Sequence, residues 1–414
     1  MKKLLIVGAG FAGLRLARSL ADKNFEVWLF DKNNYHQFQP LFYQVATSGL
    51  EPSSIAFPLR KVFQNKKHVH VRCTEVISVD TVSNILHTSI GEFAFDYLVI
   101  ATGADTNFFG NEQIRAHALP MKSVSEALHI RNTILQNFED ALSCTPEQKA
   151  AYLNIVVVGA GPTGVEVSGA LAEMRSKILP KDYPEIDFSR MHIYLVEAGG
   201  KTLGNMSGEA SEKSNTYLKQ LGVEVLTSVN VVAYDGHTVG LSTGQQLPSR
   251  TLIWAAGIKG NTILGLPEST LVRGNRFEVD DFCRIKGTTA VFAIGDIASM
   301  KTSDYPNGHP QVATVANDMA THLSKNLLRL QQGKEMLPFV YKNKGSMATV
   351  GRHLAVVDLP GLRFQGFFAW LFWMFLHLML ILGIKNKLLV FVNWMWKYFT
   401  FDQSLRLIIK PSKK

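Results

Sequence analysis

A glycine-rich motif occurs twice in this chain, each time between a short apolar run and a stretch with helical spacing. The glycines are Gly8, Gly10 and Gly13 after residues 4–7, and Gly159, Gly161 and Gly164 after residues 155–158. In a strand–turn–helix unit the first glycine permits the turn, and the second lets backbone N–H groups approach a diphosphate. The third lets helix and strand pack closely. Two copies in this context predict two Rossmann-type dinucleotide-binding units.

An acidic residue closes the predicted strand that follows each motif. Asp31 lies 18 positions after Gly13, and Glu197 lies 33 positions after Gly164 across a longer loop. In Rossmann-type units this acid accepts hydrogen bonds from the ribose hydroxyls of the nucleotide. Because a carboxylate repels the 2′-phosphate of NADPH, Glu197 favours NADH at the second site, although Lys201 is close.

Further glycine pairs indicate how the two units are connected. Predicted strands at 96–101, 251–255 and 290–294 lead to Ala101-Thr102-Gly103, to Ala256-Gly257 and to Gly295-Asp296. A motif at the chain start that is closed by a distant Gly-Asp pair is the arrangement of FAD-binding domains, in which the Asp accepts a hydrogen bond from the ribityl chain. We therefore expect an α/β fold in which the second Rossmann-like domain is inserted in the first. The expected domains are an FAD-binding domain at 1–115 and 285–336, an NADH-binding domain at 116–284, and a C-terminal region at 337–414 with apolar membrane-anchoring helices.

Charge is concentrated in the C-terminal region. Residues 331–414 hold twelve Lys/Arg and three acids, and this excess of nine equals the net charge of +9 of the whole chain. A neutral body with a basic tail argues against nucleic acid as a partner and for an anionic membrane surface. The composition, 46% hydrophobic and 19% charged, excludes a disordered chain.

The tail also contains an uncharged apolar run at 366–384, which has the length of a transmembrane candidate. A second apolar stretch at 388–401 carries Trp, Tyr and Lys, the residue types that suit a membrane interface. Basic residues flank the first run on both sides, which favours a monotopic anchor in one leaflet. A dimer or domain core and a true span remain as alternatives. His377, within the run, is interpreted as a core residue rather than a quinone ligand.

The three cysteines, Cys73, Cys144 and Cys283, are widely spaced and form no CxxC or metal-ligand pattern, so we expect reduced structural thiols and no metal. A disulfide reductase on this scaffold needs a CxxxxC pair near residues 40–50, and this stretch contains no cysteine. Electrons are therefore expected to leave the flavin directly, without a dithiol relay.

These motifs together resemble the type II NADH:quinone oxidoreductases, within the two-dinucleotide-domain flavoproteins that include glutathione reductase. The resemblance covers essentially the full length and is most specific at residues 34–46, NYHQFQPLFYQVA, which is similar to the loop beside the flavin in that family. Residues 292–296, 345–351 and 367–373 also match family patterns. The resemblance implies a non-proton-pumping enzyme in which a hydride passes from NADH to FAD and two electrons pass on to a membrane quinone.

The resemblance also implies roles for particular residues. Glu166 matches a glutamate near the nicotinamide and flavin, with a solvated helix acid as the alternative. Gln311 matches part of the AQxAxQ quinone-site pattern, but Pro310 and Val315 depart from it. The expected catalytic residues are Glu166 and Gln311. Besides the glycines, acids and pairs above, the expected cofactor contacts are Phe11, Ala12, Lys32, Gln39, Tyr43, Pro162, Thr163, Gln311, Val312 and Ala313.

We further expect a homodimer at the cytoplasmic face of a bacterial inner membrane. Two other functions remain open on the same fold: a soluble ferredoxin or rubredoxin reductase, which would dock an acidic partner on a basic face, and a redox-sensing flavoprotein without significant turnover.

Overall fold

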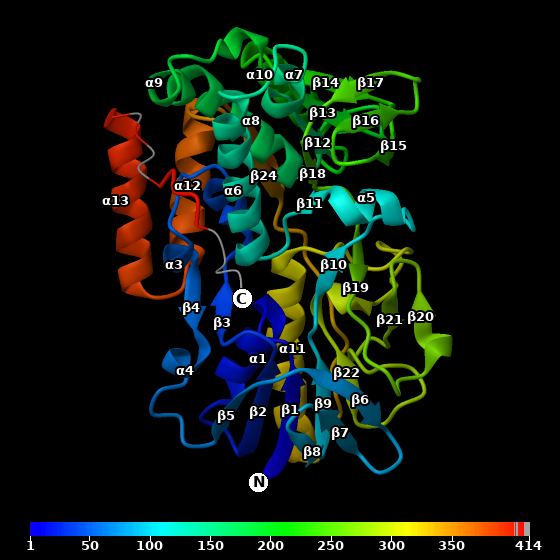
Figure 1. Cartoon of the computed structure of the whole chain (residues 1–414). Helices are drawn as coiled ribbons and strands as arrows, with labels where there is room; N and C mark the ends of the chain where they lie inside the picture. The colour runs from blue at the N-terminus through cyan, green and yellow to red at the C-terminus, as the bar shows by residue number, and fades with distance from the viewer. Residues whose placement is uncertain (401, 403–404, 410–414) are drawn as a thin grey trace. The chain divides into compact units, whose positions relative to one another are not determined.

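The computed structural model describes residues 1–400, 402 and 405–409. The chain divides into two compact units (Figure 1). The first consists of Met1–Gln37, Phe57–Asp105 and Ile258–Asn343, and the second of Phe38–Ala56, Thr106–Gly257 and Lys344–Lys414. The three domains expected from the sequence, with boundaries at 115, 284 and 336, divide the chain more finely than these two units and stay a prediction. Phe401 and three of the basic tail residues, Lys410, Lys413 and Lys414, lie outside the described residues.

The first unit is built on a five-stranded parallel sheet. Its strands are, in order, β22 (Val291–Ala293), β9 (Tyr97–Ile100), β1 (Lys2–Val7), β2 (Phe25–Asp31) and β5 (Val69–Cys73). The central strand ends in the apolar run Leu4–Val7, whose Leu4, Leu5 and Ile6 are fully buried, as expected for a strand covered on both faces. Helices α1 (Phe11–Leu20) and α11 (Ala313–Gln331) pack against each other beside this sheet.

The strand of this sheet that comes last in the chain, β22, confirms the predicted insertion. β22 pairs with β9 in parallel, so Gly295 and Asp296 return to the sheet that begins at residue 2. Smaller sheets complete the unit: β6 (Val76–Asp80) with β7 (Ile85–Thr88) and β8 (Gly91–Ala94), and β20 (Leu271–Val272) with β21 (Arg276–Glu278) and β23 (Ala298–Ser299).

The second unit repeats the same plan. Its parallel sheet has the order β11 (Leu119–Pro120), β18 (Thr251–Trp254), β12 (Ile155–Val158), β13 (Ile193–Glu197) and β14 (Glu224–Thr227). An antiparallel sheet of β15 (Val231–Tyr234), β16 (Thr238–Leu241) and β17 (Gln246–Pro248) follows β14. Together the two parallel sheets confirm the expected α/β class.

Helices surround the sheet of the second unit, and capping residues explain where the long ones begin. α6 (Val124–Ala141) begins after Ser123, whose hydroxyl accepts the Glu126 N–H at 3.2 Å. α8 (Pro162–Lys177) has proline in its first turn, where no N–H is needed. The other helices of the inserted part are α5 (Glu112–His117), α7 (Lys149–Leu153), α9 (Leu179–Asp182) and α10 (Gly208–Gln220).

The C-terminal part of the second unit is an antiparallel sheet followed by two helices. The sheet consists of β24 (Ser346–Thr349), β25 (Ala355–Leu359) and β26 (Leu362–Gln365), and the helices are α12 (Phe367–Leu380) and α13 (Ile384–Thr400). The apolar run expected at 366–384 is helical only as far as Leu380, and Gly383, with φ +79°, lies in the connection to α13. Among the described residues, none of the helices has both the length and the apolar character needed to cross a bilayer.

Helices α12 and α13 leave large apolar side chains uncovered. Phe368 is 75% exposed and Ile384 is 78% exposed, whereas Trp373 and Trp394 on the same helices are buried. We call the uncovered set the apolar helix surface. Its residues are Phe367, Phe368, Leu371, Phe375, Met379, Leu380, Ile384, Leu388, Leu389, Phe391, Val392, Trp396 and Phe399.

Candidate functional site

The glycine-rich turn of the first unit has the geometry that its sequence predicts. Gly8 has φ +101°, and a Cβ added to it would lie 2.3 Å from the carbonyl oxygen of Ala101. A Cβ on Gly13 would lie 1.8 Å from the Gly8 carbonyl oxygen, so both positions require glycine. A Cβ on Gly10 would meet no atom within 4 Å. Open space therefore lies beside the start of α1, and the N-terminus of a helix favours a bound anion.

Asp31 at the end of β2 is tied to this turn. Its Oδ2 accepts the backbone N–H of Ala9 at 2.7 Å, and its Oδ1 accepts the N–H of Asn33 at 2.7 Å. Burial raises the pKa of Asp31, and these two N–H groups and the charge of Lys32 oppose that rise. The acid is thus held at the mouth of the turn, where a ribose bound beside the turn would meet it.

The second unit reproduces this arrangement. Gly159 has φ +96°, a Cβ on Gly164 would lie 1.8 Å from the Gly159 carbonyl oxygen, and a Cβ on Gly161 would meet nothing within 4 Å. Glu197 at the end of β13 accepts the N–H of Ala160 and the N–H of Gly199, each at 2.6 Å. The pairing of turn and acid is therefore the same at both motifs.

The structure brings most of the remaining candidates of the first unit to the same edge of its sheet. Thr102 donates its hydroxyl to the carbonyl of Asn261 at 2.6 Å, and Asn261 donates its backbone N–H to the Gly103 carbonyl at 3.1 Å. Gly295 has φ +74°, and a Cβ on it would lie 3.2 Å from the Ala12 side chain at the start of α1. The Gly-Asp pair and the first motif are therefore neighbours.

Gln311 is held beside the Gly-Asp pair. Its side-chain amide donates to the backbone carbonyl of Asp296 at 2.8 Å, and α11 begins two residues later at Ala313. Val312 is exposed, and Val315, which departs from the quinone-site pattern, is buried. Gln39 and Tyr43 belong to the second unit, with Pro162, Thr163, Ala256 and Gly257.

Glu166 is a buried acid in the first turns of α8. Its Oε1 lies 3.4 Å from the backbone nitrogen of Thr349 in β24. Burial raises the pKa of Glu166 to about 8, and the N–H of Thr349 opposes this rise. The Trp373 indole also favours the charged form, although its Nε1 lies outside hydrogen-bonding geometry. At neutral pH this carboxyl therefore carries a proton, which the sequence alone could not determine.

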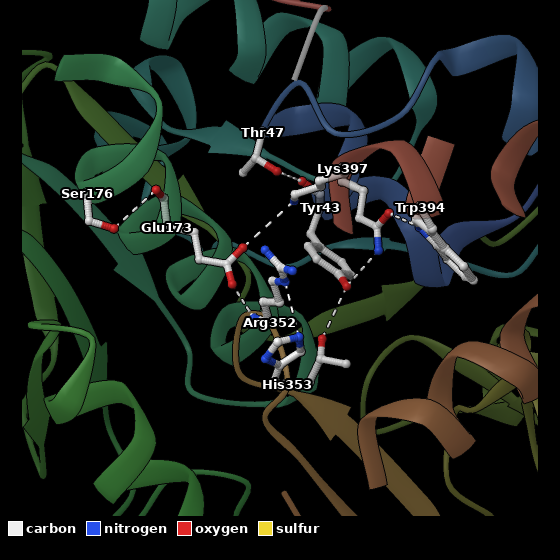
Figure 2. A network of polar contacts seen from close by, with 10 residues as sticks. Tyr43, Thr47, Glu173, Ser176, Arg352, His353, Trp394 and Lys397 are labelled. Carbon is white, nitrogen blue, oxygen red and sulfur yellow. Dashed lines mark hydrogen bonds and ion pairs between the residues drawn. The ribbon is translucent and has the colours of Figure 1, made fainter. Parts of the chain in front are cut away.

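A polar network that sequence reasoning missed lies next to Glu166. Tyr43 accepts a hydrogen bond from the Gln44 side chain at 2.9 Å and contacts the Thr349 hydroxyl at 3.2 Å (Figure 2). The indole of Trp394 in α13 donates to the Gln44 side-chain oxygen at 2.7 Å. Burial is the main cause that raises the pKa of Tyr43, followed by the charge of Glu166. The phenol therefore stays protonated.

A second acid of α8, Glu173, organises the other side of this network. It accepts the backbone N–H of Arg352, and its Oε2 lies 3.8 Å from the ammonium of Lys397. Burial lowers the pKa of Lys397, and Glu173 opposes the decrease. The Arg352 guanidinium stacks 4.4 Å from the centre of the Tyr398 ring.

These groups enclose a cavity of about 70 Å³. Its lining combines aromatic rings, two cations and one carboxylate: Tyr43, Gln44, Ala170, Glu173, Thr349, Gly351, Arg352, Trp370, Trp373, Met374, Trp394, Lys397 and Tyr398. One sequence signal could have located this region. Gly169 lies between the two acids on α8, and a Cβ there would lie 2.6 Å from the nitrogen of Gly351, so the small residue allows β24 to approach.

Comparison with known proteins gives consistent results. Residues 2–320 match the family model described as pyridine nucleotide-disulphide oxidoreductase, and residues 343–401 match the NDH2 C-terminal domain. The chain is 35% identical over 410 residues to the type II NADH:quinone oxidoreductase Ndh of Mycobacterium tuberculosis, covering 95% of this chain and 87% of that protein. It is 28% identical to an internal alternative NAD(P)H-ubiquinone oxidoreductase of Arabidopsis thaliana, over 98% and 86% of the two chains. The structure of NDH2 from Plasmodium falciparum in complex with NADH has the same fold, with a TM-score of 0.91, 23% identity, and coverage of 99% and 100%.

Proposed function

The chain belongs to the type II NADH:quinone oxidoreductases of the pyridine nucleotide-disulphide oxidoreductase family, and from this premise we propose that it oxidises NADH through FAD and reduces a membrane quinone. The observation that carries the proposal is that each unit ties an acid to the N–H of a glycine-rich turn. Two such turns fit two dinucleotides, and FAD and NADH form a pair that exchanges a hydride.

The residues of the first unit fit FAD. The open space at Gly10 beside the start of α1 accommodates a diphosphate, whose charge the helix N-terminus stabilises. Asp31 would hold the ribose hydroxyls, and Asp296 would accept a ribityl hydroxyl. Gln311, fixed by its hydrogen bond to the Asp296 carbonyl, would contact the flavin or the quinone edge.

The residues of the second unit fit NADH in the same way. Because Gly161 has no side chain, there is space for a diphosphate at the start of α8. Glu197 lies at the position expected to hold the ribose. FAD, when bound, would supply the chemistry that accepts a hydride from NADH and passes two electrons to the quinone. Reduction of a quinone to the hydroquinone also takes up two protons. Glu166, protonated at neutral pH, would supply one of them.

The apolar helix surface supports the proposal of membrane attachment. A quinone is dissolved in the lipid, so the enzyme must meet it at the bilayer, and exposed aromatic and aliphatic side chains with nearby Lys385 and Lys387 suit a monotopic contact. We place this contact at the cytoplasmic face of a bacterial inner membrane. Removal of residues 366–414 should release the protein from membrane pellets.

From the sequence we also propose that the protein is a homodimer. Its test is the mass of the purified protein in detergent by light scattering, corrected for bound detergent. A mass of one chain of 46.0 kDa would contradict it.

The first test of the function is steady-state NADH oxidation with a short-chain quinone as acceptor. We expect a yellow protein with a flavin absorbance band and quinone-dependent turnover. A colourless protein would refute the function. A flavoprotein that reduces a ferredoxin but no quinone would instead favour the ferredoxin reductase, and one without turnover the redox sensor.

The nucleotide preference tests the role of Glu197. Replacing Glu197 by alanine removes a negative charge that opposes the 2′-phosphate, and we expect the ratio of kcat/KM for NADH over NADPH to fall about 10-fold or more. The control is Glu224→Ala, an exposed acid at the other end of the neighbouring strand. An unchanged ratio in Glu197→Ala would place the ribose elsewhere.

A further inference from the structure

Trp394 starts a chain of hydrogen bonds that leads toward Glu166. The indole Nε1 lies 2.7 Å from Gln44 Oε1, Gln44 Nε2 lies 2.9 Å from the Tyr43 hydroxyl, and that hydroxyl lies 3.2 Å from Thr349 Oγ1. Thr349 in turn directs its backbone N–H at the Glu166 carboxyl. Figure 2 shows Tyr43 between Trp394 on one side and Glu173 and Arg352 on the other. Trp394, Tyr43 and Thr349 are buried.

The chemistry of the indole fixes the direction of the first two bonds in this chain. An indole N–H can only donate, so the amide oxygen of Gln44 must face Trp394 and its NH₂ must face Tyr43. The Tyr43 oxygen then accepts from Gln44. The last contact joins the phenol to the Thr349 hydroxyl, and either of these two groups can be its donor. The chain of hydrogen bonds thus ends on the residue whose backbone N–H faces Glu166.

We propose that Trp394, Gln44 and Tyr43 are positioning residues for the quinone half-reaction, because their hydrogen-bond chain holds Thr349 in place, and with it the backbone N–H that faces the Glu166 carboxyl. This inference rests on the proposed function and deepens it. Trp394 lies on α13, whose opposite face contributes Leu388, Val392 and Trp396 to the apolar helix surface. The packing of α13, the proposed membrane helix, therefore affects the Glu166 site, because the indole N–H of Trp394 connects this helix to the hydrogen-bond chain.

The test measures the two half-reactions separately by stopped-flow absorbance of the flavin. Trp394→Phe keeps an aromatic side chain but removes the indole N–H, and Gln44→Glu, as the carboxylate, keeps an acceptor for the indole but removes the donor to Tyr43. In both variants we expect reoxidation of the reduced flavin by a short-chain quinone to slow about 3- to 10-fold, the loss that one neutral hydrogen bond carries. Flavin reduction by NADH and the KM for NADH should stay unchanged.

A matched control separates this role from a structural one. Trp254 is a buried tryptophan of the same unit whose indole donates one hydrogen bond, to the Asn107 carbonyl at 3.0 Å. Trp254→Phe should leave reoxidation at the wild-type rate. In addition, Trp394→Phe and Tyr43→Phe should be non-additive when combined, because each breaks the same chain.

Three results would overturn the inference: wild-type reoxidation rates in Trp394→Phe and Gln44→Glu, equal slowing in Trp254→Phe, or independent effects in the double variant. Failure of the proposed function gives a different result, because wild-type protein would then show no quinone-dependent reoxidation at all.

Discussion

Replacing Glu166 by glutamine is expected to lower quinone reduction by about 10²-fold, the low end of the effect of a positioned general acid. The carboxyl is buried with a pKa of about 8, so it carries a transferable proton at neutral pH. Glutamine has nearly the same shape and still hydrogen bonds, but it has no such proton. Turnover measured across pH should fall above about pH 8 in the wild type and should be low and flat in Glu166→Gln.

The raised pKa of Glu166 also has a consequence for the stability of the fold. Since the folded-state pKa of Glu166 lies above its ordinary value of 4.5, the folded chain binds more protons than the unfolded chain between these values. The contribution of the group to stability is therefore complete below about pH 4.5 and is lost as the pH rises through about 8. Glu166→Gln should lack this loss, so its unfolding temperature should decline less than that of the wild type between pH 5 and 9.

The control for both measurements is Glu185→Gln, which alters an exposed acid of the same unit. It should leave the pH profile and the unfolding temperature close to wild type. Turnover of Glu166→Gln within twofold of the wild type, or an unchanged inflection near pH 8, would exclude the carboxyl as the proton donor.

Substituting Gly164 by alanine is expected to abolish NADH binding while the flavin is retained. The new Cβ would lie 1.8 Å from the Gly159 carbonyl, so α8 must move away from the turn. Overpacking of this kind costs about 1–3 kcal/mol or more of unfolding free energy. Because α8 also carries Glu166, we expect kcat/KM for NADH to fall more than about 100-fold, with a lower unfolding temperature.

Gly161→Ala is the informative partner of this variant. Its Cβ would meet no protein atom within 4 Å, so the fold should keep its unfolding temperature. The methyl group would instead occupy the space assigned to the NADH diphosphate, and the KM for NADH should rise. If Gly161→Ala binds NADH like the wild type, or Gly164→Ala retains both stability and affinity, the diphosphate does not lie at this turn.

Local sequence signals predicted most strands of the two parallel sheets and the two glycine-rich turns, but not the small antiparallel sheets of the two Rossmann-type units. The positions of these strands agree within a few residues because each contains a buried apolar run, and because Gly8, Gly13, Gly159 and Gly164 are required by contacts with their own turn or a neighbouring strand. The insertion was predictable because the Gly295-Asp296 pair follows a predicted strand at 290–294 and closes, far along the chain, the motif that begins at Gly8. β26 was missed: it is a short strand with two exposed residues, so it lacks the clear alternation that marks a half-buried strand.

The network around Tyr43 was not predictable in the same way. Trp394 and Gln44 are 350 positions apart, and nothing in either local pattern indicates their contact. Glu173 looks in sequence like a solvated helix acid, and only the approach of the turn after β24 makes it a partner of Arg352 and Lys397. The identity of such residues could be read from the chain, but their neighbours depend on tertiary packing.

The strand order of the first unit has a consequence for how the protein is made. β9 ends at Ile100, but its neighbour β22 begins only at Val291, whereas all strands of the second parallel sheet lie between Leu119 and Thr227 or at Thr251–Trp254. Synthesis on the ribosome proceeds from the N-terminus, and contacts distant in sequence form late. The inserted sheet therefore has all its strands available while the enclosing one still lacks its edge. During synthesis the sheet of the first unit is incomplete, and its first four strands must be kept from aggregating until β22 leaves the exit tunnel of the ribosome.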